Sequence, residues 1–151
     1  MTGTTGEIDM TMTIREAFDQ STTAFNAHDL DGFTDLIADD ALYQAPGGMS
    51  GAGKQACAQF FEGWLTAFPD ARVAVRDLYI CGDIAVEVGT FTGTHNGILQ
   101  SPADVIPPTG SEVSVDYVLT IRFRDGKQAE FNLMYDRLQL LEQLGLSPVS
   151  A

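Results

Sequence analysis

The feature that most constrains the fold is a long apolar–polar alternation in the C-terminal third of the chain. Apolar side chains occupy every second position from Val113 to Phe123, and again from Ala129 to Tyr135. Between these segments stands Asp125-Gly126, a dipeptide typical of tight hairpin turns. Because side chains alternate between the two faces of a strand, each segment predicts a strand with one apolar face. The sequence therefore predicts an antiparallel hairpin that buries one face and exposes the other.

The rest of the chain predicts helices first and further strands afterwards. Apolar positions spaced by three or four residues predict helices over 14–28, 30–37, 53–68 and 138–144. Thr13 and Glu16 have the spacing of a capping box, which starts the first helix. Strands are predicted over 41–45, 73–80 and 84–94, and a proline-containing loop over 96–110. We expect residues 1–10 to be a flexible lead-in and residues 11–151 to form a single domain.

This order of elements predicts an α+β fold with the helices on one face of an antiparallel sheet. The sheet is long enough to curl around the helices, which leaves a cavity between its concave face and the helix layer. Pockets of this kind are lined mostly by apolar residues, with a few polar groups among them.

The charge balance excludes two classes of partner. The chain carries 8 basic and 21 acidic residues, a net charge of −13. A nucleic-acid binder needs cationic side chains that displace phosphate counterions, and a membrane-surface protein needs a basic face. The apolar runs are far shorter than the roughly 20 residues of a membrane span. We therefore expect a cytoplasmic protein whose partner is neither nucleic acid nor membrane.

The usual patterns of metal and phosphate sites do not occur in the sequence. There is no HxH or HExxH motif, and Cys57 and Cys81 are too far apart for a CxxC pair. The glycine-rich segment 47–54 lacks the Lys-Ser/Thr ending of a phosphate-binding loop. We expect no metal and no cofactor.

Short motifs in a fixed order resemble the SnoaL-like polyketide cyclases of the nuclear transport factor 2-like superfamily. The resemblance covers about residues 14–146 and rests on these segments: Ala24-Phe25-Asn26 with His28-Asp29, Gly63-Trp64 through Phe68-Pro69-Asp70, Gly93-Thr94-His95-Asn96-Gly97, Pro107-Pro108-Thr109-Gly110, Asp125-Gly126-Lys127 with Glu130, and Leu140-Leu141-Glu142-Gln143-Leu144-Gly145. It implies a cone in which a strongly curved antiparallel sheet wraps around three N-terminal helices, with a short C-terminal helix. It also implies a homodimer that pairs through the convex sheet face.

The same resemblance implies a catalytic aspartate on the last strand and a histidine on the neighbouring strand. Counted from Asp125-Gly126-Lys127, these positions hold Leu133 and Leu119 in this sequence. A leucine can neither take up nor release a proton. The proton-transfer pair of the family is therefore missing at its own positions.

Other residues are candidates for the missing chemistry. His95 follows a long strand and precedes the proline-containing loop, so it is expected at the cavity mouth, where a histidine can act as acid or base. The alternative is a loop histidine that caps backbone groups. Tyr117 and Tyr135 are expected to polarise a ligand carbonyl, although a tyrosine is also an ordinary strand residue. The predicted ligand-binding residues are Phe25, Tyr43, Trp64, Leu119, Phe131 and Leu133.

Two functions follow from these observations. The first is a small-molecule enzyme that catalyses cyclisation, isomerisation or dehydration of an apolar, oxygenated, polyketide-like ligand by acid–base chemistry. The second is a non-catalytic protein whose cavity binds an apolar small molecule or is simply filled, which the losses at Leu119 and Leu133 favour.

Overall fold

The computed structural model describes residues 2–100 and 105–146. The helices in this part of the chain are α1 (Thr2–Asn26), α2 (Leu30–Thr34), α3 (Lys54–Ala67) and α4 (Arg137–Gln143). The strands are β1 (Ile37–Ala45), β2 (Met49–Ala52), β3 (Arg72–Cys81), β4 (Ile84–Thr94), β5 (Leu99–Gln100), β6 (Val105–Ile106), β7 (Glu112–Arg124) and β8 (Lys127–Tyr135).

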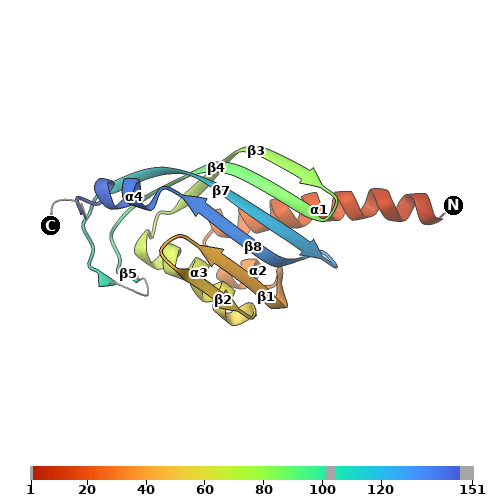
Figure 1. Ribbon diagram of the computed structural model, residues 1–151, viewed down its shortest axis with the longest axis horizontal. Coiled ribbons are helices and arrows are strands. Elements are labelled where there is room, and N and C mark those ends of the chain that lie inside the picture. Colours follow the sequence, from red (N-terminus) through yellow and green to blue (C-terminus); the bar gives the residue numbers. More distant parts are fainter. Residues whose placement is uncertain (1, 101–104, 147–151) are drawn as a thin grey trace.

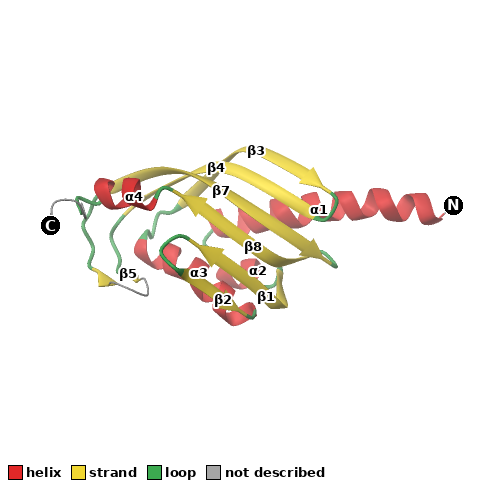
Figure 2. Ribbon diagram, in the orientation of Figure 1, coloured by secondary structure: helices red, strands yellow, loops and turns green. Residues whose placement is uncertain are grey.

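One six-stranded sheet forms the body of the protein. Its strand order is β2-β1-β8-β7-β4-β3, and neighbouring strands are antiparallel except for the parallel pair β1 and β8. The sheet is curved, with α1, α2 and α3 on one side of it and α4 following β8 (Figures 1 and 2). Strands β5 and β6 form a separate two-stranded sheet. This arrangement confirms the predicted α+β class, a curved sheet wrapped around three helices and followed by a short C-terminal helix.

The predicted hairpin is confirmed residue by residue. In β7 the odd-numbered side chains from Val113 to Phe123 are buried, and those between them face outward. Tyr117 pairs with Tyr135 and Leu119 with Leu133 across the hairpin. A bulge shifts the register after Arg122. Because a bulge adds one residue to a strand, the neighbours Gln128 and Ala129 are both buried, which strict alternation does not allow.

Several predicted element boundaries are wrong. The first helix begins at Thr2 rather than after Thr13, so residues 2–10 of the expected lead-in are helical. No proline interrupts this stretch, and the predicted capping box lies inside the helix. Ile37, predicted at the end of a helix, is a fully buried β-branched residue that begins β1. Within the predicted loop 96–110, residues 99–100 and 105–106 are strands.

No helix within residues 2–100 and 105–146 is long and apolar enough to cross a membrane.

Candidate active site

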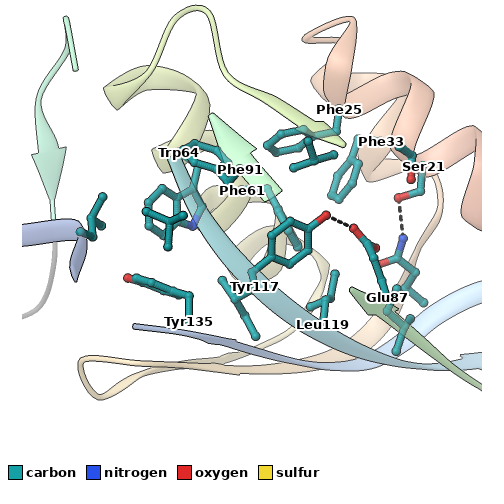
Figure 3. A pocket seen from close by; sticks show the side chains of 17 residues that line it. Ser21, Phe25, Phe33, Phe61, Trp64, Glu87, Phe91, Tyr117, Leu119 and Tyr135 are labelled. Carbon is teal, nitrogen blue, oxygen red and sulfur yellow. Dashed lines mark hydrogen bonds between the residues drawn. The ribbon is translucent and has the colours of Figure 1, made fainter. Parts of the chain in front are cut away.

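A pocket lies between the concave face of the sheet and the helices (Figure 3). The space inside it, including the part open to solvent, is about 770 Å³. Its lining is mostly aromatic and aliphatic: Phe25, Phe33, Phe61, Trp64, Val73, Phe91, Val115, Tyr117, Leu119, Ile121, Leu133, Tyr135 and Leu140. Polar side chains enter this lining from Ser21, Thr22, Glu87 and Gln128. An apolar pocket with a few converging polar groups is the usual form of a small-molecule site.

Glu87 is the acidic residue of this lining. It lies on β4, and only 5% of it is exposed. The Tyr117 hydroxyl donates a hydrogen bond to Glu87 Oε2 (Figure 3). Burial raises the pKa of Glu87 to about 7, although the hydrogen bond from Tyr117 acts in the opposite direction. The carboxyl group is therefore able to give or take a proton near neutral pH.

The position of Tyr117 depends on the residue opposite it. Tyr117 pairs with Gly89 across β7 and β4. A Cβ atom on Gly89 would lie 2.8 Å from the Tyr117 hydroxyl oxygen, closer than real Cβ atoms approach other heavy atoms. The missing side chain therefore gives the phenol ring the room to reach Glu87. Burial also raises the pKa of Tyr117, and the Glu87 charge adds to this effect, so Tyr117 remains a hydrogen-bond donor.

A second polar pair lines the pocket at Gln128 and Ser21. Gln128 is 1% exposed, and its Nε2 donates to Ser21 Oγ at 2.7 Å. The Oε1 atom of Gln128 is buried and has no hydrogen-bond partner among the described residues. Because an unpaired buried acceptor is costly, this oxygen is suited to accept a hydrogen bond from a ligand hydroxyl.

Trp64 and Tyr135 lie at the other end of the pocket from Glu87 and Ser21 (Figure 3). Their rings are 5.6 Å apart and nearly perpendicular. Burial raises the pKa of Tyr135 to about 12, so its hydroxyl is protonated at neutral pH. The pocket therefore has an aromatic end and an acidic end, with Tyr117 and Leu119 between them.

The structure brings six of the predicted site residues together in this lining: Phe25, Trp64, Tyr117, Leu119, Leu133 and Tyr135. Tyr43 and Phe131 do not line it. Tyr43 stacks on Phe60, and Phe131 is fully buried against Tyr43 and Phe61. Both rings belong to the core beneath β1 and β8 rather than to the cavity surface.

His95 does not line the pocket either. It is fully buried and packs against Phe68, which in turn packs against Trp64 and Phe91. Its Nδ1 accepts a hydrogen bond from the Thr109 backbone N–H at 3.2 Å and lies 2.9 Å from Thr109 Oγ1. This arrangement corresponds to the alternative interpretation, a histidine that caps backbone groups of the loop.

Sequence patterns missed Glu87 and Gln128. Both faces of β4 carry apolar residues, so alternation does not tell which face is buried. The available signal was that Glu87 is the one charged residue between Ile84 and Thr94. Gln128 turns inward because of the bulge in β8, and no turn or glycine signal in the sequence predicts that bulge.

One row across the sheet relates these residues to the positions that the resemblance singled out. Glu87 pairs with Leu119 on the neighbouring strand, and Leu119 pairs with Leu133 on the next. The two leucines stand where the resemblance places a histidine and an aspartate. The carboxyl group of this chain therefore lies one strand further along the same row. No group of three metal-binding side chains occurs within the described residues.

Known proteins share this sequence pattern and this fold. The sequence model of the SnoaL-like polyketide cyclase family matches residues 15–144. No match was found among curated proteins.

Solved structures of similar fold include AclR, a putative hydroxylase from Streptomyces galilaeus, with 27% identity and a TM-score of 0.74 over 89% of this chain and 82% of that one. IdmH, a putative polyketide cyclase from Streptomyces antibioticus, has 26% identity and a TM-score of 0.71 over 88% of this chain and 99% of that one. A putative SnoaL-like polyketide cyclase from Jannaschia sp. CCS1 has 20% identity and a TM-score of 0.79 over 91% of this chain and 94% of that one. By its match over most of its length, the chain belongs to the SnoaL-like polyketide cyclase family.

Proposed function

We propose that this protein is an enzyme that performs acid–base chemistry without a cofactor on an apolar, oxygenated, polyketide-like ligand. The observation that carries the proposal is Glu87, a buried carboxyl group in an apolar pocket with a pKa near 7. A structural role does not explain a carboxyl group there, because burial of its charge opposes folding. Glu87 and its hydrogen-bond partner Tyr117 both have strongly perturbed pKa values, and such pairs in a cavity are typical of catalytic sites.

The proposed reaction is proton transfer next to a ligand carbonyl. Ionised Glu87 takes a proton from the carbon beside the carbonyl, and the electron pair of the broken C–H bond forms an enolate. Protonated Glu87 then returns the proton. In an isomerisation the proton goes to another carbon of the enolate system; in a dehydration it goes to a hydroxyl that leaves as water when the enolate expels it and its C–O bond breaks. In a ring closure the enolate carbon forms a bond to a second carbonyl carbon of the ligand, and the proton goes to the resulting alkoxide. Tyr117 is a positioning residue that fixes one carboxyl oxygen and leaves the other for the ligand. Gln128 Oε1 accepts a ligand hydroxyl.

A ketone of simple structure tests this chemistry. The probe is α-tetralone, an apolar bicyclic ketone, and the measurement is exchange of its C2 protons for deuterium by NMR. We expect the wild-type protein to accelerate exchange, with a rate that rises with pH through about 7 as Glu87 ionises. Glu87→Gln should lower the catalysed rate by roughly 10²–10⁴-fold, the usual contribution of a general base.

The matched control is Glu130→Gln, since Glu130 is exposed on the outer face of β8. It should leave the exchange rate unchanged. Quenching of the fluorescence of Trp64, the single tryptophan of the chain, shows independently whether the probe enters the pocket. Binding without any acceleration by the wild-type protein would refute catalysis and support the alternative of a ligand-binding protein.

The homodimer expected from the resemblance is also a proposal. The outer face of the sheet carries Val118 and Met134, which are neighbours across β7 and β8 and are 37% and 67% exposed. Exposed apolar neighbours on a sheet face support an interface. Light scattering should give the mass of a dimer for the wild-type protein and a smaller average mass for Met134→Lys. A wild-type monomer at micromolar concentration would contradict the dimer.

A further inference from the structure

A second pocket adjoins the candidate active site at its aromatic end. Trp64, Tyr135 and Leu140 line both pockets. The second pocket adds residues from α3, β2, α4 and the small β5–β6 sheet, among them Leu99 and Arg137. The two pockets therefore meet at these three side chains, with Glu87 in the lining of the first and Arg137 in the lining of the second.

Arg137 is the positive charge of this second pocket. It is the first residue of α4 and is half-buried. Within the described part of the chain, no carboxylate oxygen lies within 4.0 Å of its guanidinium, and no Asp or Glu lines the pocket. The side chain of the preceding residue, Asp136, is turned to the start of α4, where it accepts a hydrogen bond from the Gln139 backbone N–H. Among the described residues, the guanidinium therefore has no acidic partner.

The side chain of Arg137 lies against the turn between β1 and β2. A Cβ atom on Gly47, in the turn between β1 and β2, would lie 2.9 Å from Arg137 Nε, so the arginine occupies the space that a larger residue would fill. The positive charge of Arg137 also lowers the pKa of Tyr135, against the larger effect of burial. Guanidinium and phenol both line the second pocket, and both are hydrogen-bond donors.

We propose that Arg137 and Tyr135 bind an acid group, a carboxylate, of the aromatic substrate whose rings extend past Trp64 toward Glu87. The inference rests on the proposed function, because it assigns the substrate class of the same site. Arginine has the planar donor geometry that matches a carboxylate, and Tyr135 adds a further donor. In a chain of net charge −13, Arg137 supplies the positive charge in the lining of this pocket. Arg137 therefore selects ligands with an acid group at the end remote from Glu87.

A pair of probes that differ only in charge tests the inference. Anthraquinone-2-carboxylate and anthraquinone-2-carboxamide have the same rings, and their binding is measured by quenching of Trp64 fluorescence. We expect the wild-type protein to bind the carboxylate at least about tenfold more tightly, the weakest effect expected of a hydrogen bond to a charged group. Arg137→Gln should remove this preference, because it weakens the binding of the carboxylate probe and leaves the binding of the carboxamide probe unchanged. Arg137→Lys should retain part of it, since a lysine keeps the charge without the planar geometry.

The control is Arg124→Gln, which removes an arginine that pairs with Asp40 on the outer surface and should leave both dissociation constants unchanged. Equal affinity of the wild-type protein for the two probes, no binding of either, or equal weakening of both by Arg137→Gln would overturn the inference.

The outcome separates this inference from the proposed function. Glu87→Gln should keep the carboxylate preference, because Glu87 lies at the opposite end of the first pocket. A preserved preference together with unaccelerated tetralone exchange refutes the catalysis and not the acid-binding site. Accelerated exchange without a carboxylate preference refutes the acid-binding site alone.

Discussion

Glu87 and His95 belong to the same stretch of chain, the first within β4 and the second directly after it, and both are buried. In each case burial shifts the pKa toward the neutral form, upward for Glu87 and downward for His95. Their surroundings differ. Glu87 borders a cavity, whereas His95 is enclosed by Phe68 and the loop at Thr109. A perturbed pKa is thus common to both residues, and access to open space distinguishes the candidate catalyst.

The opposite pKa shifts of Glu87 and His95 predict opposite dependences of stability on pH. The largest change in stability is expected for Glu87→Gln. The folded protein keeps the Glu87 proton up to pH about 7, whereas the unfolded chain releases it near the ordinary value of 4.5. Stability is therefore lost as pH rises from 4.5 to 7, and the pKa difference corresponds to about 3 kcal/mol. Glutamine carries no charge at any pH and still accepts the hydrogen bond from Tyr117.

Urea denaturation at pH 4 and pH 8 measures this effect. Glu87→Gln should be about 3 kcal/mol more stable than the wild-type protein at pH 8, and the two should be nearly equal at pH 4. If Glu87→Gln and the wild-type protein were equally stable at both pH values, the Glu87 charge would be well solvated, and the basis of the proposed function would be removed.

The second prediction concerns the glycine that makes room for Tyr117. A Cβ atom on Gly89 would lie 2.7 Å from the Ala74 carbonyl oxygen, a backbone atom, and 2.8 Å from the Tyr117 hydroxyl. Gly89→Ala should therefore lower the free energy of unfolding by about 1–3 kcal/mol, the usual cost of overpacking. The measurement is again urea denaturation.

Gly63→Ala is the matched control. Gly63 lies within α3, and no heavy atom lies within 4 Å of the position that its Cβ would take. Alanine is the better helix former, so this variant should gain about 0.5–1 kcal/mol. The same destabilisation in both variants would contradict a specific role for Gly89.

The sequence predicted the fold well because the fold depends on regular patterns. The alternation from Val113 to Phe123 determines which face of β7 is buried, and Asp125-Gly126 determines the turn. The candidate site depends on two departures from regularity. Glu87 breaks an apolar strand whose faces look alike, and Gln128 is turned inward by a bulge. Histidine chemistry made His95 a candidate, yet its place behind Phe68 follows from tertiary packing that no local pattern records.

His95→Ala provides the third prediction, with the pH dependence opposite to that of Glu87. The variant loses the contact with Thr109 and the packing on Phe68, so it should be about 2 kcal/mol less stable than wild type at pH 7.5. The folded-state pKa of His95 lies below its ordinary value of 6.5. As pH falls through 6.5, the unfolded wild-type chain gains a proton that the folded protein does not, and wild-type stability is lost.

The stability gap between His95→Ala and wild type should therefore narrow below pH 6.5. Denaturation at pH 7.5 and pH 5 measures the gap. At a temperature where the variant is folded, its tetralone exchange rate should stay close to that of wild type. A loss of exchange as large as that of Glu87→Gln would instead restore His95 as a catalytic candidate.

Tyr117→Phe is expected to have the smallest effect, and it acts on the pKa that the proposed function requires. The phenol donates a hydrogen bond to Glu87 Oε2, which favours the ionised carboxylate and lowers the pKa of Glu87. Phenylalanine removes this bond and leaves the effect of burial unopposed. The midpoint of the exchange rate against pH should therefore move above its wild-type value of about 7.

Tyr79→Phe, which changes an exposed tyrosine of β3, should leave the midpoint where it is. An unshifted midpoint in Tyr117→Phe would mean that the group titrating in the rate is not the carboxyl group that Tyr117 contacts. A downward shift would mean that the phenol binds the protonated form more strongly. An upward shift alone supports Glu87, hydrogen-bonded to Tyr117, as the group that titrates in the rate. Only in that case does a change at Tyr117 act on the rate by raising the pKa of Glu87.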